Sequence, residues 1–456
     1  MTAIDRLAAG EVTATELVEA SLARIAQVEG EVGAFVTVTA ALAREQAAAA
    51  DAAYADGRSL GPLHGLPVGL KDNIDTAGIV TTAGAGFFLD RVPAEDAEVT
   101  RRLHAAGAVL VGKLTMHELA FGATSQNEHT GPCRNPWDLS RIPGGSSGGS
   151  GAAVAADEVP VSLGTDTGGS VRIPGSLNGV VGLRTTFGRV SNRGIYPIAV
   201  SFDTCGPLAR HAIDVARVLT VLAGYDADDP NSVDHPAEDY AAGIDGGIAG
   251  VRIGVPRGFF FSELDPEVEA AVRAAADQLA RLGARVEEID LPGAENTHAI
   301  VATMVRTDAL ALHRERVAAH PEQFGGEVLR RLRSAESVTG ADYAAALDAG
   351  RAWRRQVARL FEGVDIVLTP AACIPAPPAE DSGDVIETTR LMTRLTYAWT
   401  LAGVPAVSVP CGFTRAGLPV GLQLAGGAWQ EALLLRAAHA YQQVTDWHER
   451  PAPLGG

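Results

Sequence analysis

Two glycine-rich segments contain the serines best placed to do chemistry. The first is PGGSSGGSG, residues 143–151, and the second is GTDTGGSVRIP, residues 164–174. Glycine permits backbone conformations and close approaches that other residues forbid, so such loops can present several N–H donors to a ligand. Serine hydroxyls beside these donors could accompany phosphate binding or attack a carbonyl carbon.

A candidate base stands out by residue type. Of the 37 basic residues only two are lysines, Lys71 and Lys113. Lysine, unlike arginine, can lose its proton when it is buried and can then act as a base. Lys71 follows the apolar run GLPVGL, where partial burial would lower the pKa of its amine. With a bridging hydroxyl and a nucleophilic hydroxyl, Lys71 would complete a serine–lysine hydrolase.

Two other interpretations of the glycine-rich segments fit less well. A phosphate-binding loop needs GxxxxGK followed by Ser or Thr, but residues 107–114, GAVLVGKL, end in leucine and have a strand-like interior. Residues 144–148, GGSSG, match the GxSxG nucleophile elbow of other hydrolases, which must directly follow a strand. The preceding DLSRIPG is typical of a turn-rich loop, so the pattern favours the serine–lysine hydrolase.

The elements that position these residues indicate an α/β fold. Residues 1–60 and about 265–360 have the apolar spacing of helices, whereas residues 61–210 contain short apolar runs separated by Gly, Pro, Ser and Asn. Further strands are expected at DIVLTPA, PAVSVPCG and LPVGLQLAG, before a closing helix. Strands at both ends of the chain predict one mixed sheet assembled from distant segments. Residues 1–456 are therefore interpreted as a single domain.

Composition excludes several classes of function. The formal net charge of −18 would repel a nucleic-acid backbone. No apolar run reaches the roughly 18 residues of a membrane helix, and the first residues lack the basic start and apolar stretch of a signal peptide. The eleven histidines show no metal-binding spacing, so no metal site is expected. The cysteines are far apart, which favours reduced thiols and a cytoplasmic protein: Cys133, Cys205, Cys373 and Cys411.

Four long blocks closely resemble the amidase signature family. They are GLPVGLKDNID, RNPWDLSRIPGGSSGGSGAAVAA, GTDTGGSVRIPGSLNGVVGLRTTFGRVS and SFDTCGPLAR, and they occur in the family's order. The resemblance extends from ELVEASLARI near the start to LPVGLQLAG near the end. It implies a twisted mixed β-sheet covered by α-helices on both faces, with residues 61–210 as the signature core. Helical residues from about 300 to 350 would cover the cleft.

The resemblance also implies a catalytic triad. Ser170, in TGGSVR, matches the family's nucleophile; Ser146, the first serine of GGSSGG, matches a bridging serine on a cis peptide bond; and Lys71 matches the base. The backbone N–H groups of Thr167, Gly168, Gly169 and Ser170 would form the oxyanion hole. No cofactor is implied, because the chain supplies every group that acyl transfer needs.

Neighbouring residues receive supporting roles. By family position, Phe121, Thr124 and Ser125 should lie near the acyl pocket, and Lys113 should support the site without catalysing. Asp166 and Asp203 are interpreted as loop anchors that accept backbone N–H bonds. Ser147 is expected to hydrogen-bond its loop, Arg172 to form a buried ion pair, and His117 with Glu118 to resemble half a metal motif and nothing more.

The substrate class predicted from the resemblance is a small, neutral and fairly apolar amide, bound by a monomer or homodimer. Carbamates (urethanes) and aryl esters are chemically reachable because they pass through the same tetrahedral species. The main alternative is a glutaminase that acts in a complex, like the A subunit of glutamyl-tRNA amidotransferase. That branch usually reads SIRQPA at the nucleophile, where this chain has SVRIPG, and carries a carboxylate near Thr393. A second alternative, a binding protein without catalysis, is disfavoured because all three triad positions keep reactive groups.

Overall fold

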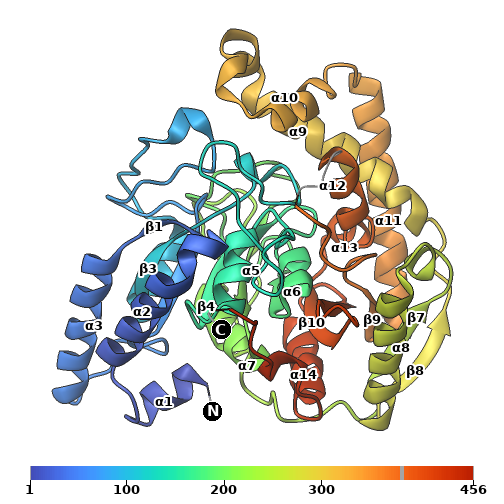
Figure 1. Cartoon of the computed structure of the whole chain (residues 1–456). Helices are drawn as coiled ribbons and strands as arrows, with labels where there is room; N and C mark the ends of the chain where they lie inside the picture. The colour runs from blue at the N-terminus through green and yellow to red at the C-terminus, as the bar shows by residue number, and fades with distance from the viewer. Residues whose placement is uncertain (1, 380–384, 455–456) are drawn as a thin grey trace.

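The computed structural model describes residues 2–379 and 385–454, which fold around an eleven-stranded mixed sheet (Figure 1). The strands follow the order β1-β3-β2-β4-β6-β5-β10-β11-β9-β7-β8 across the sheet. Their bounds are β1 Phe35–Val38, β2 Pro67–Lys71, β3 Val109–Leu114, β4 Val161–Asp166, β5 Val181–Arg184, β6 Thr204–Ala209, β7 Arg252–Pro256, β8 Arg285–Ile289, β9 Ile366–Pro370, β10 Ala406–Phe413 and β11 Pro419–Gly426.

The sheet combines parallel and antiparallel pairs from segments far apart in the chain. Strand β2 is parallel to both β3 and β4, and β7 is parallel to β8 and β9, whereas β10 is antiparallel to β5 and β11. Every residue of β2, β3 and β4 is buried, as expected for strands covered on both faces. The predicted single sheet built from distant segments is confirmed.

Helices cover the sheet on both faces. Helix α5 packs against α6 and β4, and α6 packs against β10 and β11, whereas α7 packs against α14, β5 and β6. The helices are α1 Ala3–Ala8, α2 Ala14–Val32, α3 Ala40–Ala55, α4 Glu98–Ala105, α5 Gly148–Ala155, α6 Arg172–Asn178, α7 Ala212–Leu222, α8 Pro266–Arg281, α9 Thr297–Ala319, α10 Gly326–Arg333, α11 Gly340–Gly363, α12 Val385–Thr393, α13 Tyr397–Ala402 and α14 Glu431–Gln442. Short 3₁₀ turns occur at Gly86–Phe88, Glu118–Ala120, Phe259–Phe261, Ala294–Asn296, Pro321–Gln323 and Trp447–Glu449.

The N-terminal region shows how local sequence sets its elements. Thr13 and Glu16 form a reciprocal capping box that begins α2, and Gly33 ends the helix in a left-handed conformation. The segment that follows, FVTV, forms strand β1, although it lies in a region predicted to be helical. Its four residues pair antiparallel with β3 at one edge of the sheet. β-branched residues favour a strand, but a run this short is hidden between two helical patterns.

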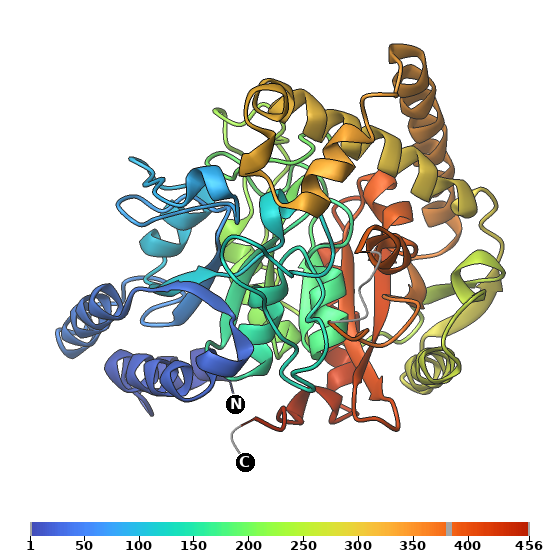
Figure 2. The same ribbon diagram turned by 45° about the horizontal axis from the view of Figure 1, so that its top comes forward.

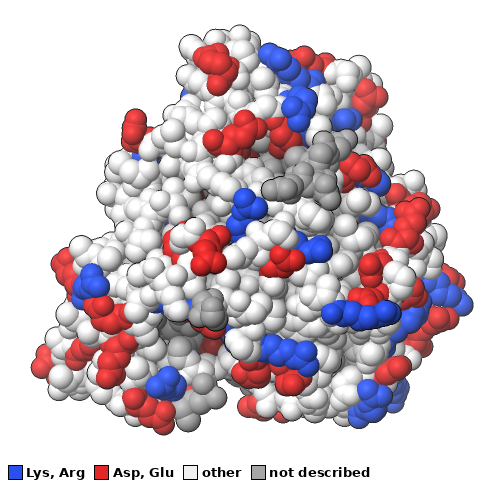
Figure 3. Space-filling view, in the orientation of Figure 1, with Lys and Arg blue, Asp and Glu red and all other residues white. Residues whose placement is uncertain are grey.

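Helices α9, α10 and α11 form a layer beyond one end of the strands (Figure 2). Helix α9 packs against α10, α11 and α13, and this layer has its own hydrophobic cluster, which includes Val301, Val305, Leu332 and Trp399. On the face in Figure 3, acidic and basic side chains are interspersed. Within the described ranges, each helix is too short or too polar to cross a membrane.

Candidate active site

Lys71 is the last residue of β2 and is completely buried. Its Nζ lies 2.7 Å from Ser146 Oγ and 2.7 Å from Thr165 Oγ1. Burial lowers the pKa of Lys71 to about 7, although the charges of Asp166 and Asp203 oppose this shift. An amine with such a pKa is substantially unprotonated near neutrality and can accept a proton from a hydroxyl.

Ser146 is the residue whose hydroxyl contacts the Lys71 amine. The Gly145–Ser146 peptide bond is cis, as the resemblance implied. A Cβ on Gly145 would lie 2.8 Å from the carbonyl carbon of Ala123, so only glycine fits this close approach. The carbonyl oxygen of Ser146 accepts the backbone N–H of His117 at 3.0 Å, which fixes the loop.

Ser170 lies within the second glycine-rich segment, two residues before α6 begins, and is 8% exposed. Its carbonyl oxygen accepts the backbone N–H of Ser147 at 3.2 Å, so the two glycine-rich loops are neighbours. Ser147 also donates its hydroxyl to the carbonyl of Thr165 at 3.1 Å, in line with its expected structural role. Among the described residues, no hydrogen bond joins the hydroxyls of Ser146 and Ser170.

The four backbone donors expected in the oxyanion hole are not equivalent. The Gly169 N–H donates to Asp166 Oδ1 at 2.8 Å and is therefore already occupied. Within the described part of the chain, the N–H groups of Thr167, Gly168 and Ser170 have no acceptor. The Thr396 hydroxyl donates to the Gly168 carbonyl and holds this turn from the opposite side. The turn thus leaves three of these N–H donors, rather than four, available to an acceptor in the pocket.

A buried ion cluster supports the nucleophile segment. Asp166 lies 3.0 Å from both Arg172 and Arg184, and all three side chains are fully buried. Although burial works in the opposite direction, the two guanidinium charges hold the pKa of Asp166 well below its usual range. Arg172 also donates to Gln423 Oε1 at 2.7 Å and to the Thr396 carbonyl at 3.0 Å, so this arginine has the structural role expected from the sequence.

Asp203 is the second loop anchor. Its carboxylate accepts the Thr167 hydroxyl at 2.5 Å and the backbone N–H groups of Ile198 and Ala199. Burial raises the pKa of Asp203 to about 6, and these three hydrogen bonds oppose the increase. Asp203 therefore orients Thr167, which begins the glycine turn 167–170.

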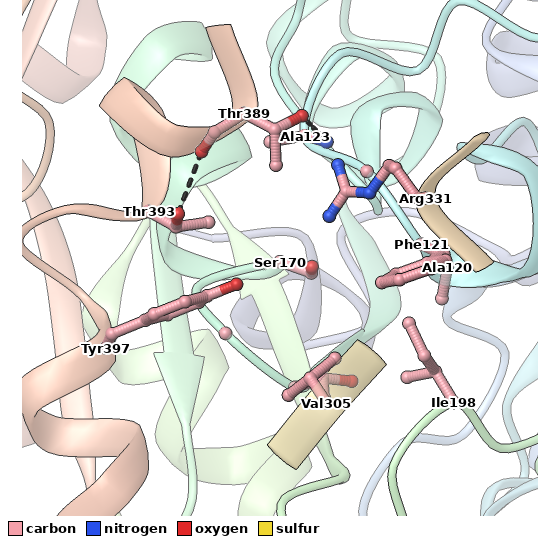
Figure 4. Close-up of a pocket in the computed structure, with 13 residues that line it drawn as sticks. Ala120, Phe121, Ala123, Ser170, Ile198, Val305, Arg331, Thr389, Thr393 and Tyr397 are labelled. Atoms are coloured by element: carbon pink, nitrogen blue, oxygen red, sulfur yellow. Dashed lines mark hydrogen bonds between the residues drawn. The ribbon is translucent and has the colours of Figure 1, made fainter. Parts of the chain in front are cut away.

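A small pocket opens beside Ser170 (Figure 4). Phe121 lines it, as expected from the resemblance. Thr124 and Ser125 do not: the Thr124 hydroxyl lies 3.2 Å from His117 Nδ1, and Ser125 Oγ accepts the Gly148 N–H at 3.0 Å. These two side chains instead hold the loops around the triad. The remaining lining residues are Ala120, Gly122, Ala123, Thr167, Gly168, Ile198, Val305, Arg331, Thr389, Thr393 and Tyr397.

Comparison with known proteins shows the family of this chain. The amidase family model matches residues 16–435. The chain belongs to the amidase family. It is therefore a hydrolase that acts on C–N amide bonds, with the mixed-sheet fold of its relatives.

Three known proteins are similar to this amidase over nearly its whole length. The A subunit of the glutamyl-tRNA(Gln) amidotransferase of Roseiflexus sp. (strain RS-1) is 44% identical, over 99% of this chain and 97% of the relative. A solved structure described as an unexpected vestigial protein complex that reveals the evolutionary origins of an s-triazine catabolic enzyme has a TM-score of 0.92 at 39% identity, covering 97% of this chain and 98% of that one. The peptide amidase of Stenotrophomonas maltophilia has a TM-score of 0.84 at 33% identity, covering 99% and 97%.

Several pocket residues of the amidase were missed by sequence reasoning. Val305 comes from α9, Arg331 from α10 and Tyr397 from α13. Figure 4 shows the guanidinium of Arg331 and the phenol of Tyr397 directed toward the centre of the pocket from different sides. Arg331 lies in the run LRRLR, where nothing in the local sequence distinguishes it from Arg330 or Arg333.

Proposed function

We propose that this amidase hydrolyses small amides whose acyl part carries a carboxylate. Ser170 would be the nucleophile, Ser146 the proton bridge and Lys71 the base. The observation that carries the substrate class is the position of Arg331, whose guanidinium faces the same pocket as Ser170 (Figure 4).

The proposed reaction follows from the contacts around Lys71. Neutral Lys71 takes the proton of Ser146 while Ser146 takes that of Ser170, whose oxygen attacks the amide carbon. The contact between the two serine hydroxyls is expected to form when substrate binds, because catalytic hydrogen bonds often tighten only then. The N–H groups of Thr167, Gly168 and Ser170 would hold the oxyanion. The relay then protonates the leaving nitrogen, the C–N bond breaks, and water hydrolyses the acyl ester.

The pocket favours an anionic substrate over the neutral, apolar amide suggested by the sequence. The Arg331 side chain is only 14% exposed, and one of its nitrogens is paired with the Glu327 carboxylate at 3.3 Å, so its other N–H donors are available to an anion in the pocket. Phe121, Val305 and Ile198 supply apolar surface, and no acidic side chain lines the pocket within the described ranges. A carboxylate could bind Arg331 through two parallel hydrogen bonds while its alkyl chain packs on this surface.

An adjoining outer chamber supports the same substrate class. It shares Phe121, Val305, Arg331, Thr389, Thr393 and Tyr397 with the inner pocket. Two more arginines line it, Arg306 and Arg390, against one carboxylate, Glu387, which Arg390 already binds at 2.5 Å. In a chain of net charge −18, this chamber is a local region of positive charge that would attract an anion.

A second candidate is a glutaminase that acts in a complex. It is favoured by the 44% identity to the A subunit of an amidotransferase over nearly the whole chain. Glutamine also carries a carboxylate that Arg331 could bind, but its ammonium group would need an acceptor. Thr393 lines the pocket where the sequence comparison placed a carboxylate, and its hydroxyl donates to the Thr389 carbonyl at 2.8 Å. Under this candidate the chain would need a partner protein instead of acting as the expected monomer or homodimer.

The test is a set of matched substrates. The purified enzyme would receive the monoamides succinamate and glutaramate, the corresponding methyl esters of their free carboxylates, glutamine, and an aryl carbamate. We expect kcat/KM for the carboxylates to exceed that for the neutral esters by roughly 10- to 100-fold, the value of one charge-assisted contact. Arg331→Met should remove this preference, and Ser170→Ala should abolish turnover of every substrate. Equal turnover of the neutral analogues by the wild-type enzyme would overturn the proposal.

Glutamine separates the two candidates. Ammonia release from glutamine, with no turnover of succinamate or glutaramate, would favour the glutaminase. Carbamates and aryl esters remain predicted secondary substrates, because the same tetrahedral intermediate leads to their cleavage.

A further inference from the structure

His117 contacts both the catalytic loop and a residue that holds the pocket arginine. Its backbone N–H donates to the carbonyl of the catalytic Ser146 at 3.0 Å. Its ring is buried, with Nε2 2.9 Å from Glu327 Oε2 and Nδ1 3.2 Å from the Thr124 hydroxyl. A Cβ on Gly122 would lie 2.1 Å from Nε2, so the ring has no room to shift toward that residue. The half metal motif noted in the sequence is thus part of a hydrogen-bonded network.

The protonation of the His117 ring follows from its partners. Although burial works in the opposite direction, the contacts with His117 and Arg331 lower the pKa of Glu327, so its carboxylate is ionised and can only accept hydrogen bonds. His117 Nε2 must therefore carry a proton toward Glu327. The other ring nitrogen, Nδ1, lies 3.2 Å from the Thr124 hydroxyl.

Glu327 holds Arg331 from the adjacent turn of α10. Its Oε1 lies 3.3 Å from the Arg331 guanidinium, in an i,i+4 pair. The guanidinium also lies over the Phe121 ring, 4.4 Å from its centroid. One guanidinium nitrogen faces Glu327 and the guanidinium carbon lies over the Phe121 ring, which leaves the other donors for the pocket in which Figure 4 shows the group.

We propose that His117 and Glu327 are positioning residues that fix Arg331 for the substrate carboxylate. Because His117 also anchors Ser146, one residue sets the distance between the carboxylate-binding site and the catalytic serines. The pocket thereby selects substrates by the distance between their carboxylate and their scissile amide. This inference rests on the proposed carboxylate specificity.

Two variants remove the positioning contacts and leave Arg331 in place. Glu327→Gln keeps the shape of the side chain but removes its charge, and His117→Phe keeps a ring but removes the donor to Glu327. We expect each to raise KM for glutaramate roughly 10-fold, with kcat and the KM of its methyl ester within about twofold of the wild type. His117→Gln, which can still donate to Glu327, should restore most of the affinity. Labelling of Ser170 by a phosphonofluoridate should keep its wild-type rate in all of them.

A matched control comes from another helix. Glu269 and Arg273 form the same i,i+4 pair on α8, at 2.8 Å, and are partly exposed. Glu269→Gln should leave KM and kcat unchanged for both substrates. If His117→Phe does not fold, Glu327→Gln tests the proposal alone.

The outcomes distinguish this inference from the proposed function. If Arg331→Met loses the carboxylate preference while Glu327→Gln and His117→Phe keep the wild-type KM, the positioning role is overturned and the substrate class stands. If Arg331→Met keeps the preference, the substrate class is itself wrong and the inference falls with it. An equal loss of kcat with charged and neutral substrates in Glu327→Gln would make the pair a structural ion pair only, which also overturns the positioning role.

Discussion

The two lysines of this chain lie on neighbouring parallel strands but face different surroundings. Lys71 ends β2, and Lys113 lies in β3, where it is paired with Leu70. Adjacent residues of a strand point to opposite faces, so Lys71 and Lys113 project to opposite sides of the sheet. Both side chains are fully buried.

The partners of the two amines differ. Lys113 donates to the carbonyl of Ile74 and to the hydroxyls of Thr76, at 3.2 Å, and Thr81, at 2.8 Å, all within one loop. Burial lowers the pKa of Lys113 to about 8, against the charge of Asp72. Lys71 instead contacts Ser146, which lies in the first glycine-rich loop. This loop is hydrogen-bonded to the loop that carries Ser170.

The comparison shows that burial makes a lysine capable of acting as a base but does not by itself make it catalytic. The pKa of both amines falls into a similar range for the same reason. The two amines differ in their access to the pocket. The hydroxyl beside Lys71 belongs to the loop next to Ser170, whereas the acceptors of Lys113 all lie in the loop 74–81, which Lys113 holds together. We therefore expect one lysine to control activity and the other to control stability.

The largest expected effect is the loss of activity in a Lys71 variant, which tests the difference between the two lysines directly. Lys71→Met removes the base but keeps an apolar side chain of similar length, and kcat should fall by about 10³-fold or more, in line with the loss of a general base for which the relay has no substitute. Lys113→Met should keep most of its activity per folded molecule. Steady-state rates normalised to the folded fraction measure both. Comparable losses in the two variants would show that the lysines are not functionally different.

The next effect concerns stability. Lys113→Met leaves the Ile74 carbonyl and two threonine hydroxyls without their buried donor, and the free energy of unfolding should decrease by roughly 2–4 kcal/mol. Urea denaturation followed by circular dichroism gives this value. Lys71→Met is the matched control and should change the free energy less, because the Thr165 hydroxyl keeps the Asn73 amide as a partner at 3.2 Å. A larger loss in Lys71→Met would contradict the assignment.

The smallest expected effect is the pH dependence of kcat/KM, which should follow Lys71 and not Lys113. Lys71 must be unprotonated to act, so kcat/KM should increase with pH up to about 7 and then level off. Below that value the rate should drop about tenfold per pH unit, since each unit leaves ten times less of the neutral amine. Lys113→Met should keep the same profile. A profile that stays flat from acidic pH to pH 8, or one that moves in Lys113→Met, would exclude Lys71 as the titrating base.

The glycine-rich blocks made the catalytic loops predictable. Local sequence predicted the strands β2 and β4 and the candidate base Lys71, whereas the cis Gly145–Ser146 bond and the pairing of Lys71 with Ser146 were implied by the resemblance to the amidase signature family. The same local reasoning missed strand β1, where four residues are too few to show a period. The resemblance placed the Gly169 N–H in the oxyanion hole, and nothing in the sequence indicated that this N–H donates to Asp166, because that hydrogen bond depends on how the turn packs.

By itself the sequence indicated the mixed sheet and, through its resemblance, the family and the candidate reactive groups, because strand patterns and motifs depend on residue types at neighbouring positions. Only the tertiary structure decided what the pocket recognises. Val305, Arg331 and Tyr397 come from three separate helices, and a helical periodicity does not say which member of LRRLR will face a cavity. That choice depends on the docking of α9, α10 and α13, which is set by packing between segments far apart in the chain.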